Sequence, residues 1–210
     1  QITASNLKSS LSGMLVPGGL KIVDMNRDGV LDNNDRTDLG NPYPDFNWGI
    51  TNNFKYKNID FSFLVQGVQG GKVINGDPNY NESRRTIKIY NQNRWVSAAN
   101  PGDGKTPFST NGYNWMLTDY VIENGSYFAL REVNLGYTLP TSSIKKLKIT
   151  SMRFYLSAQN LYFHTAKGYR SLNPEGRFSN GPYSSVLIDG YQRGAFPIPQ
   201  TITAGIDINF

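Results

Sequence analysis

The sequence has no cysteine, a single histidine and no long apolar run. Without cysteine it can form neither disulfides nor thiolate metal sites. A Ser-His-Asp triad would depend on His164 alone, so we do not expect an enzyme. A membrane-spanning helix needs about 18 or more consecutive apolar residues, and no stretch of the chain approaches that length. These absences exclude a helical membrane span and disfavour catalysis.

The sequence also lacks a starting methionine, a signal peptide and any block of like charge. It begins with Gln1, and we therefore expect the chain to be a piece of a longer protein. The net charge of +5 is spread along the chain rather than gathered in one basic stretch. Proteins that bind nucleic acid usually carry a concentrated basic patch, so no nucleic-acid partner is expected.

What the sequence does have is strict alternation of apolar and polar residues, clearest in the last ten residues, TITAGIDINF. A strand that crosses an outer membrane needs about 9 to 11 residues with this period of two. Four earlier segments repeat the pattern, at 46–56, 59–66, 126–139 and 150–162. The polar tripeptide 56–58 between the first two predicts a hairpin with a tight turn. Five strands are therefore expected.

The links between these segments alternate in length. Those at 56–58 and 140–149 are short, whereas 68–125 and 163–199 are long and polar. Outer-membrane barrels have short periplasmic turns and long extracellular loops. The predicted fold class is therefore all-β: a transmembrane antiparallel β-barrel, of which this chain holds about the last five strands with long extracellular loops.

Five strands cannot close a membrane barrel, because the smallest have about eight. We expect the missing strands to lie outside this chain, since an open edge in lipid would leave backbone groups unpaired. The expected division is an extracellular loop segment at 1–44 and the barrel strands with their loops at 45–210.

The same period assigns side chains to the two faces of the wall. Lipid is expected on one face, the barrel interior on the other. The predicted lipid-facing residues are Phe46, Trp48, Phe61, Phe63, Leu135, Phe154, Ile206 and Ile208, and the predicted interior residues are Asp60, Gln66, Gln159 and Asp207.

The sharpest chemical motif is DMNRDGVLDNND at 24–35. Calcium takes six to eight oxygen ligands, and a short loop that wraps the ion needs a glycine at its sharp turn, here Gly29. An alternative is a solvated turn rich in Asn and Asp, which favour turns for local reasons. We favour a structural Ca²⁺ site, although position twelve is Asp rather than the usual Glu. Its predicted ligands are Asp24, Asn26, Asp28, the Val30 carbonyl, Asp32 and Asp35.

Four ordered blocks resemble SusC-like TonB-dependent transporters of Bacteroidetes, in the C-terminal part of their barrel. They are DMNRDGVLDNNDRTDLGNP at 24–42, ENGSYFALREVNLGYTLP at 123–140, MRFYLSAQNL at 152–161 and PIPQTITAGIDINF at 197–210. Between them, NRW at 93–95 followed by NP at 100–101, and GY at 168–169 followed by NPE at 173–175, resemble loop signatures of that family.

The resemblance implies a barrel of 22 strands with an internal plug, located in the outer membrane. It implies a SusD-like surface lipoprotein as a lid and import of oligosaccharides or peptides as cargo. It also implies energy coupling by TonB, through an N-terminal part missing from this chain. The terminal aromatic, Phe210, matches the signal that the barrel-assembly machinery reads.

Two rival classes remain open at this point. A calcium loop beside alternating strands also occurs in secreted β-sandwich modules that serve adhesion or carbohydrate binding, and there the apolar faces would form a compact core. An enzyme is the third class, and the scarcity of His and Cys weighs against it. Aromatic residues in the long loops could stack on sugar cargo or pack the loops together: Tyr113, Trp115, Tyr183 and Tyr191.

Overall fold

The computed structural model describes residues 8–9, 17–76, 93–108, 118–176, 190–192 and 195–210. Contacts divide the chain into two compact units. The first comprises 1–42, 72–123 and 177–194, and the second comprises 43–71, 124–176 and 195–210. The sequence placed its boundary after residue 44, next to the first of these boundaries. The first unit, however, also takes in 72–123 and 177–194, which are parts of the two long links.

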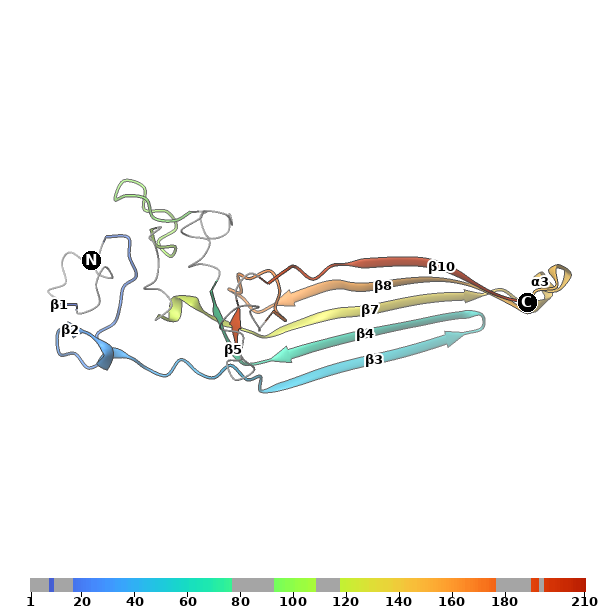
Figure 1. The fold of residues 1–210 in the computed structure, drawn as a ribbon, viewed down its shortest axis with the longest axis horizontal. Coiled ribbons are helices and arrows are strands. Elements are labelled where there is room, and N and C mark those ends of the chain that lie inside the picture. The colour runs from blue at the N-terminus through green and yellow to red at the C-terminus, as the bar shows by residue number, and fades with distance from the viewer. Residues whose placement is uncertain (1–7, 10–16, 77–92, 109–117, 177–189, 193–194) are drawn as a thin grey trace. The chain divides into compact units, whose positions relative to one another are not determined.

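The second unit is built on a single five-stranded antiparallel sheet, drawn side by side in Figure 1. Its spatial order is β10-β8-β7-β4-β3. All five predicted strands are therefore confirmed as strands of one sheet. Their bounds are β3 Phe46–Tyr56, β4 Ile59–Gln69, β7 Tyr127–Thr138, β8 Ser151–Thr165 and β10 Thr201–Asn209.

Short connections meet at one end of this sheet. The predicted hairpin is present: Tyr56 pairs with Ile59, and Lys57 turns the chain with a left-handed φ of 52°. The second short link carries a helical turn, α3 Thr141–Ile144, followed by the 3₁₀ turn η5 Lys145–Leu147. Figure 1 places the hairpin turn, α3 and the C-terminus together at this end, opposite the ends that lead into the long links.

The register confirms the predicted division of side chains between two faces. Phe54 pairs with Phe61, Phe61 with Leu135, and that chain of partners continues through Leu156 to Ala204. Directly opposed residues share a face, so one apolar face runs without interruption across all five strands. All eight predicted lipid-facing residues lie on it. The four predicted interior residues lie on the other face.

The apolar face is uncovered within the second unit. Phe46, Phe54 and Ile206 are each more than half exposed, at 56%, 54% and 57%. Phe54, Phe61 and Phe63 pack together, with ring centroids 6.0 to 6.3 Å apart, in the half of the hairpin nearer its turn. A contiguous apolar surface of this extent marks contact with lipid or with a partner rather than with water.

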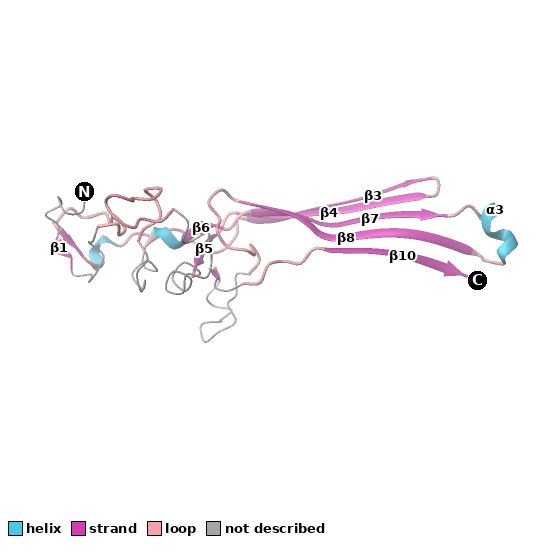
Figure 2. Cartoon of the chain, turned by 90° about the horizontal axis from the view of Figure 1, so that it is seen from above, coloured by secondary structure: helices cyan, strands magenta, loops and turns pink. Residues whose placement is uncertain are grey.

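The first unit holds short elements that the sequence pattern did not predict, because runs of two to four residues cannot display a period. β1 Lys8–Ser9 pairs in parallel with β2 Val30–Leu31, and the 3₁₀ turns η2 Asn33–Asp35 and η4 Asp119–Val121 accompany them. A second sheet has the order β6-β5-β9 and appears in Figure 2. Its strands are β5 Lys72–Asn75, β6 Ile122–Asn124 and β9 Tyr191–Gln192.

Leu31, Val73 and Val121 are fully buried and form the core of these short elements. Buried polar groups there are paired, since Asn75 donates to the Glu123 carboxylate at 2.7 Å. None of the described helices is long and apolar enough to cross a membrane.

Candidate functional site

The predicted cation loop at 24–35 is closed by its own side chains. The Asp24 carboxylate accepts hydrogen bonds from the Arg27 N–H at 2.6 Å and the Gly29 N–H at 2.9 Å. Asn26 Oδ1 accepts from the Asp28 N–H at 3.0 Å, and Asp28 Oδ1 accepts from the Val30 N–H at 2.7 Å. These hydrogen bonds hold the backbone in a tight loop at the predicted ligand positions.

Two left-handed residues produce the sharp turn of this loop. Arg27 has a φ of 62° and Gly29 a φ of 83°. Glycine adopts this conformation without steric cost, which is why a calcium loop carries it at this position. A calcium loop and an Asx-rich turn both need a sharp turn here, so these φ values do not distinguish the two predictions.

The end of the loop is tied to its start. Asp35 accepts from the Met25 N–H at 2.8 Å and from the Asp32 N–H at 2.9 Å, while Asp32 caps η2 by accepting from the Asn34 N–H at 2.7 Å. The Asp32 N–H, followed by those of Met25 and Asn26, holds the pKa of Asp35 below its usual value. Because the pKa of Asp35 is lower in the folded state, its carboxylate stabilises the fold fully above about pH 4. This stabilisation is lost as the pH falls through the lowered pKa.

Two observations bear on whether the loop at 24–35 could coordinate calcium. Each carboxylate oxygen that accepts one N–H keeps a second lone pair for an ion, so the loop hydrogen bonds are compatible with coordination. Within the described residues, however, no group of three or more Asp, Glu, His or Cys side chains is placed to hold one metal ion. The predicted set includes an amide, Asn26, and a carbonyl, Val30. The calcium site stays a prediction.

A second polar centre lies on the polar face of the five-stranded sheet. Arg153 of β8 donates to Asp60 of β4, with Nη2 2.7 Å from Oδ2, and lies 3.6 Å from Asp207 of β10. The residue between them on β7 is Gly136. A Cβ there would clash with Arg153 Nη2 and with the Asp60 carboxylate, so a larger residue would separate the pair.

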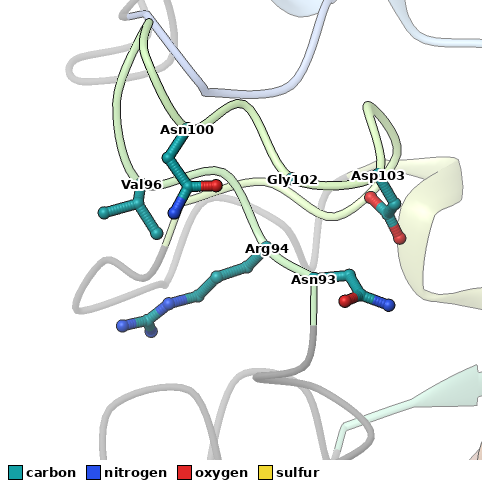
Figure 3. A pocket seen from close by; sticks show the side chains of 6 residues that line it. All are labelled: Asn93, Arg94, Val96, Asn100, Gly102 and Asp103. Carbon is teal, nitrogen blue, oxygen red and sulfur yellow. The ribbon is translucent and has the colours of Figure 1, made fainter.

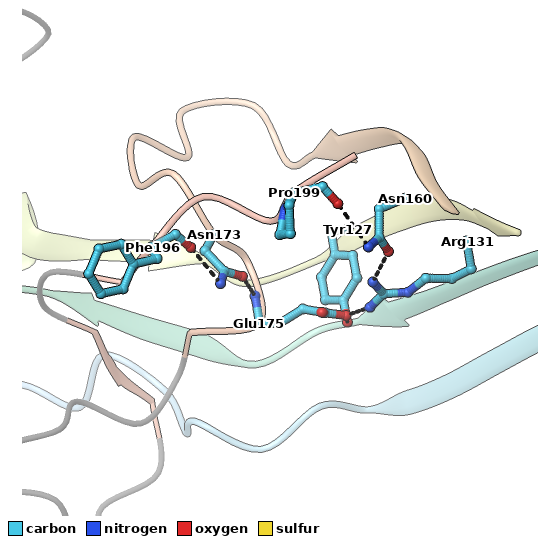
Figure 4. Close-up of polar contacts among 7 residues, drawn as sticks. All are labelled: Tyr127, Arg131, Asn160, Asn173, Glu175, Phe196 and Pro199. Atoms are coloured by element: carbon cyan, nitrogen blue, oxygen red, sulfur yellow. Dashed lines mark hydrogen bonds and ion pairs between the residues drawn. The ribbon is translucent and has the colours of Figure 1, made fainter. Parts of the chain in front are cut away.

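A third polar centre on the same face surrounds Arg131, which the sequence pattern did not single out (Figure 4). Arg131 forms an ion pair with Glu175 and donates to Asn160 Oδ1 at 2.8 Å. The Tyr127 hydroxyl donates to the same Glu175 at 2.7 Å. One feature of the sequence could have identified it: Arg131 interrupts the alternation of apolar and polar residues in its strand.

The hollow at residues 93–103 belongs to a different loop. It has a volume of about 480 Å³ and is lined by Asn93, Arg94, Val96, Asn100, Gly102 and Asp103. The Arg94 side chain extends away from Asp103 (Figure 3). The Asp103 carboxylate accepts from the N–H groups of Thr106 and Lys105 and from the Thr106 hydroxyl, and these bonds, Thr106 first, lower its pKa. The loop is thus braced internally by the Asp103 carboxylate.

The remaining predicted residues fall in three places. Phe210 follows β10 in phase with the apolar face and is 88% exposed. Tyr191 lies in β9 of the first unit. Tyr113, Trp115 and Tyr183 lie outside the described residues.

Comparison with known proteins identifies relatives over almost the whole chain. TonB-dependent receptors P26 and P3 of Formosa agariphila are 32% and 30% identical over 205 and 211 residues, in each case 96% of this chain. TonB-dependent receptor SusC of Bacteroides thetaiotaomicron is 23% identical over 189 residues, 90% of this chain and 17% of that protein. The chain spans only 20% of the length of P26 and of P3. No protein-family model matches.

Solved structures agree on the fold. The RagAB peptide importer in its open-open state matches with a TM-score of 0.58 and 22% identity, over 80% of this chain and 17% of that chain. Its closed-closed state matches with a TM-score of 0.59 and 21% identity over the same shares. At this identity the match concerns the fold, which is that of a segment of an antiparallel barrel wall. The chain is therefore similar, over almost its whole length, to a stretch of about a fifth of TonB-dependent receptors, SusC among them.

Proposed function

We propose that this chain forms the C-terminal part of the barrel wall of an outer-membrane importer. The observation that carries the proposal is the continuous apolar face across five strands, with a charged and hydrogen-bonded face behind it. Strands of 9 to 15 residues are long enough to cross the hydrocarbon layer. Lipid then lies against the apolar face, and the polar face lines the interior.

The orientation in the membrane follows from the connections. The end with the hairpin turn and α3 would face the periplasm, because short turns occur on that side of outer-membrane barrels. The long links, and the segment at 1–44 with its calcium loop, would lie outside the cell. Calcium there would have a structural role, ordering the loop that leads into β3.

Partners and cargo are proposed from kinship. SusC is among the relatives of this chain, and by that kinship a SusD-like surface lipoprotein would cover the outer opening. The cargo class is oligosaccharides or peptides. TonB would couple energy through a part of the protein outside this chain. We propose no catalytic role: the single histidine, His164, pairs with Phe128 on the apolar face.

Purification of the full-length protein from its native membrane tests the proposal. We expect it in the outer-membrane fraction, dependent on detergent, with a surface lipoprotein in stoichiometric amount by native mass spectrometry. A secreted protein that stays folded and monomeric without detergent would instead support the calcium-stabilised β-sandwich module. The uncovered apolar face argues against that alternative, because a sandwich buries it.

We also propose that β10 and Phe210 carry the signal that the barrel-assembly machinery recognises. Phe210 is 88% exposed, so we expect it to contribute little to stability by packing. Deleting Phe210 from the full-length protein should therefore lower the amount of folded barrel in the outer membrane. Heat-modifiable mobility on gels measures that amount. Conservative replacement by Tyr is the control and should retain normal levels; normal levels after deletion would contradict an assembly role.

A further inference from the structure

We propose that Arg131 is a positioning residue that holds the segment 166–176 folded down over the polar face of the wall. If the polar face lines the barrel interior, as proposed above, this segment rather than bare strands forms the inner surface at that level. It would then set the free width available to cargo near the outer opening.

The position of Arg131 results from a break in strand pairing. Leu130 and Glu132 of β7 have consecutive partners on β4, Val65 and Leu64, so Arg131 is the extra residue of a bulge. A bulge redirects the inserted side chain and often lies at a functional position. Here it places a guanidinium on the polar face in addition to the regular residues of the strand.

Every nitrogen of that guanidinium has a partner. Nη1 donates to Asn160 Oδ1 at 2.8 Å, and Nη2 meets the Glu175 carboxylate. With its amide oxygen turned toward the arginine, Gln66 of β4 accepts from Nε at 2.6 Å and Nη2 at 2.9 Å. The group also lies 5.0 Å from the centre of the Phe163 ring. Arg131 thus joins β4, β7 and β8 to Glu175, a residue beyond the end of β8.

Glu175 is held from two sides. The Tyr127 hydroxyl donates to it at 2.7 Å, and the Tyr127 ring packs near Phe163, with centroids 6.3 Å apart. The side chains of Arg131 and Glu175 are 17% and 30% exposed, so the ion pair is largely shielded from water. Removing one member of a shielded pair leaves the other charge poorly compensated.

The segment that carries Glu175 is stabilised by hydrogen bonds of its own. The Tyr169 hydroxyl donates to the Asn173 carbonyl at 2.9 Å, and the Glu175 N–H donates to Asn173 Oδ1 at 2.8 Å. Pro174 between them is buried. These hydrogen bonds link Glu175 through Asn173 to Tyr169, so a restraint on Glu175 reaches most of the segment.

The returning chain is tied to the same place. Asn173 Nδ2 donates to the Phe196 carbonyl at 2.9 Å, and Asn160 Nδ2 donates to the Pro199 carbonyl at 3.1 Å (Figure 4). Asn160, which accepts from Arg131, thus connects the guanidinium to the entry into β10. The two ends of the long link between β8 and β10 are therefore held by one hydrogen-bond network, and Arg131 lies at its centre.

Hydrogen exchange on the full-length protein in detergent, measured by mass spectrometry, tests the inference. The variants are Arg131→Gln, Glu175→Gln and the double variant. Each single variant should speed exchange of the amides at 169–176 by about tenfold or more, because a hydrogen bond to a charged group holds this local structure closed. The double variant should add little to Arg131→Gln, because that substitution already removes the ion pair with Glu175.

Lys167→Gln is the matched control, because it removes a charge from the same segment at an exposed side chain. It should leave exchange unchanged. Glu175→Gln lies outside the strands and preserves shape, so it remains informative if Arg131→Gln fails to assemble. Unchanged exchange at 169–176 in Glu175→Gln would overturn the role of Arg131, whatever the cargo or the membrane location. Faster exchange with unaltered uptake of large cargo would instead overturn the link to free width.

Discussion

Replacing Phe63 by Arg is expected to lower the free energy of unfolding of the full-length barrel by about 2 to 4 kcal/mol, the cost of a cation near the bilayer midplane. Phe63 lies near the middle of β4, opposite Asn52 and Val133, on the apolar face. It also packs against Phe54 and Phe61. Urea unfolding in lipid vesicles, followed by tryptophan fluorescence, measures the effect.

The matched control is Asn53→Arg, one residue from the partner of Phe63 but on the polar face of β3. That side chain would enter the interior, where a charge can be hydrated, so we expect a change of well under 1 kcal/mol. Equal costs at the two positions would show that the faces are not divided between lipid and interior. A negligible cost at Phe63 would have the same meaning.

Replacing Asp28 by Ala is expected to abolish calcium binding in the millimolar range while leaving the barrel folded. Extracellular sites of this kind bind with Kd values of about 10⁻⁴ to 10⁻³ M, so losing a carboxylate removes binding altogether under physiological conditions. Asp28 also accepts from the Val30 N–H, and its loss should loosen the turn. Isothermal titration calorimetry of the full-length protein with CaCl₂ measures binding, and gel mobility checks the barrel.

Asn33→Ala is the control for the calcium prediction, because Asn33 is exposed and occupies a loop position that supplies no ligand. Its calorimetric signal should equal that of the unmodified protein. If Asp28→Ala also leaves the signal unchanged, or if the unmodified protein gives none, the loop is a turn stabilised by Asx side chains alone. The hydrogen bonds that Asp24, Asn26 and Asp28 accept from loop N–H groups would suffice for that.

The sheet could be predicted because its information is local. Alternation in β3 and β4, and the tripeptide between them, specify two strands, their faces and their turn within 24 residues of sequence. The face of each strand follows from the period alone, and a shift of one residue would expose polar groups to lipid. This is why the predicted faces agree with the register at every named position.

The Arg131 network could not be predicted because its information is not local. Arg131 and Glu175 are separated by a strand, a link and another strand, and neither residue type demands the other. The bulge that aims Arg131 depends on pairing with β4, which a single sequence does not display. The short strands β5, β6 and β9 were not predicted for a related reason: a run of two to four residues is too short to show a period.

The edges of the five-stranded sheet have a thermodynamic consequence. Within the described sheet, β3 and β10 each have a neighbour on one side only. In hydrocarbon, every unpaired N–H or C=O group costs several kcal/mol, so strands from elsewhere must complete both edges before the wall can be stable. The free energy of unfolding is therefore a property of the closed cylinder and cannot be divided among its strands. A substitution in β10 therefore changes the stability of the strand pairing that closes the barrel. Through that pairing it also affects strands that lie far away in the sequence.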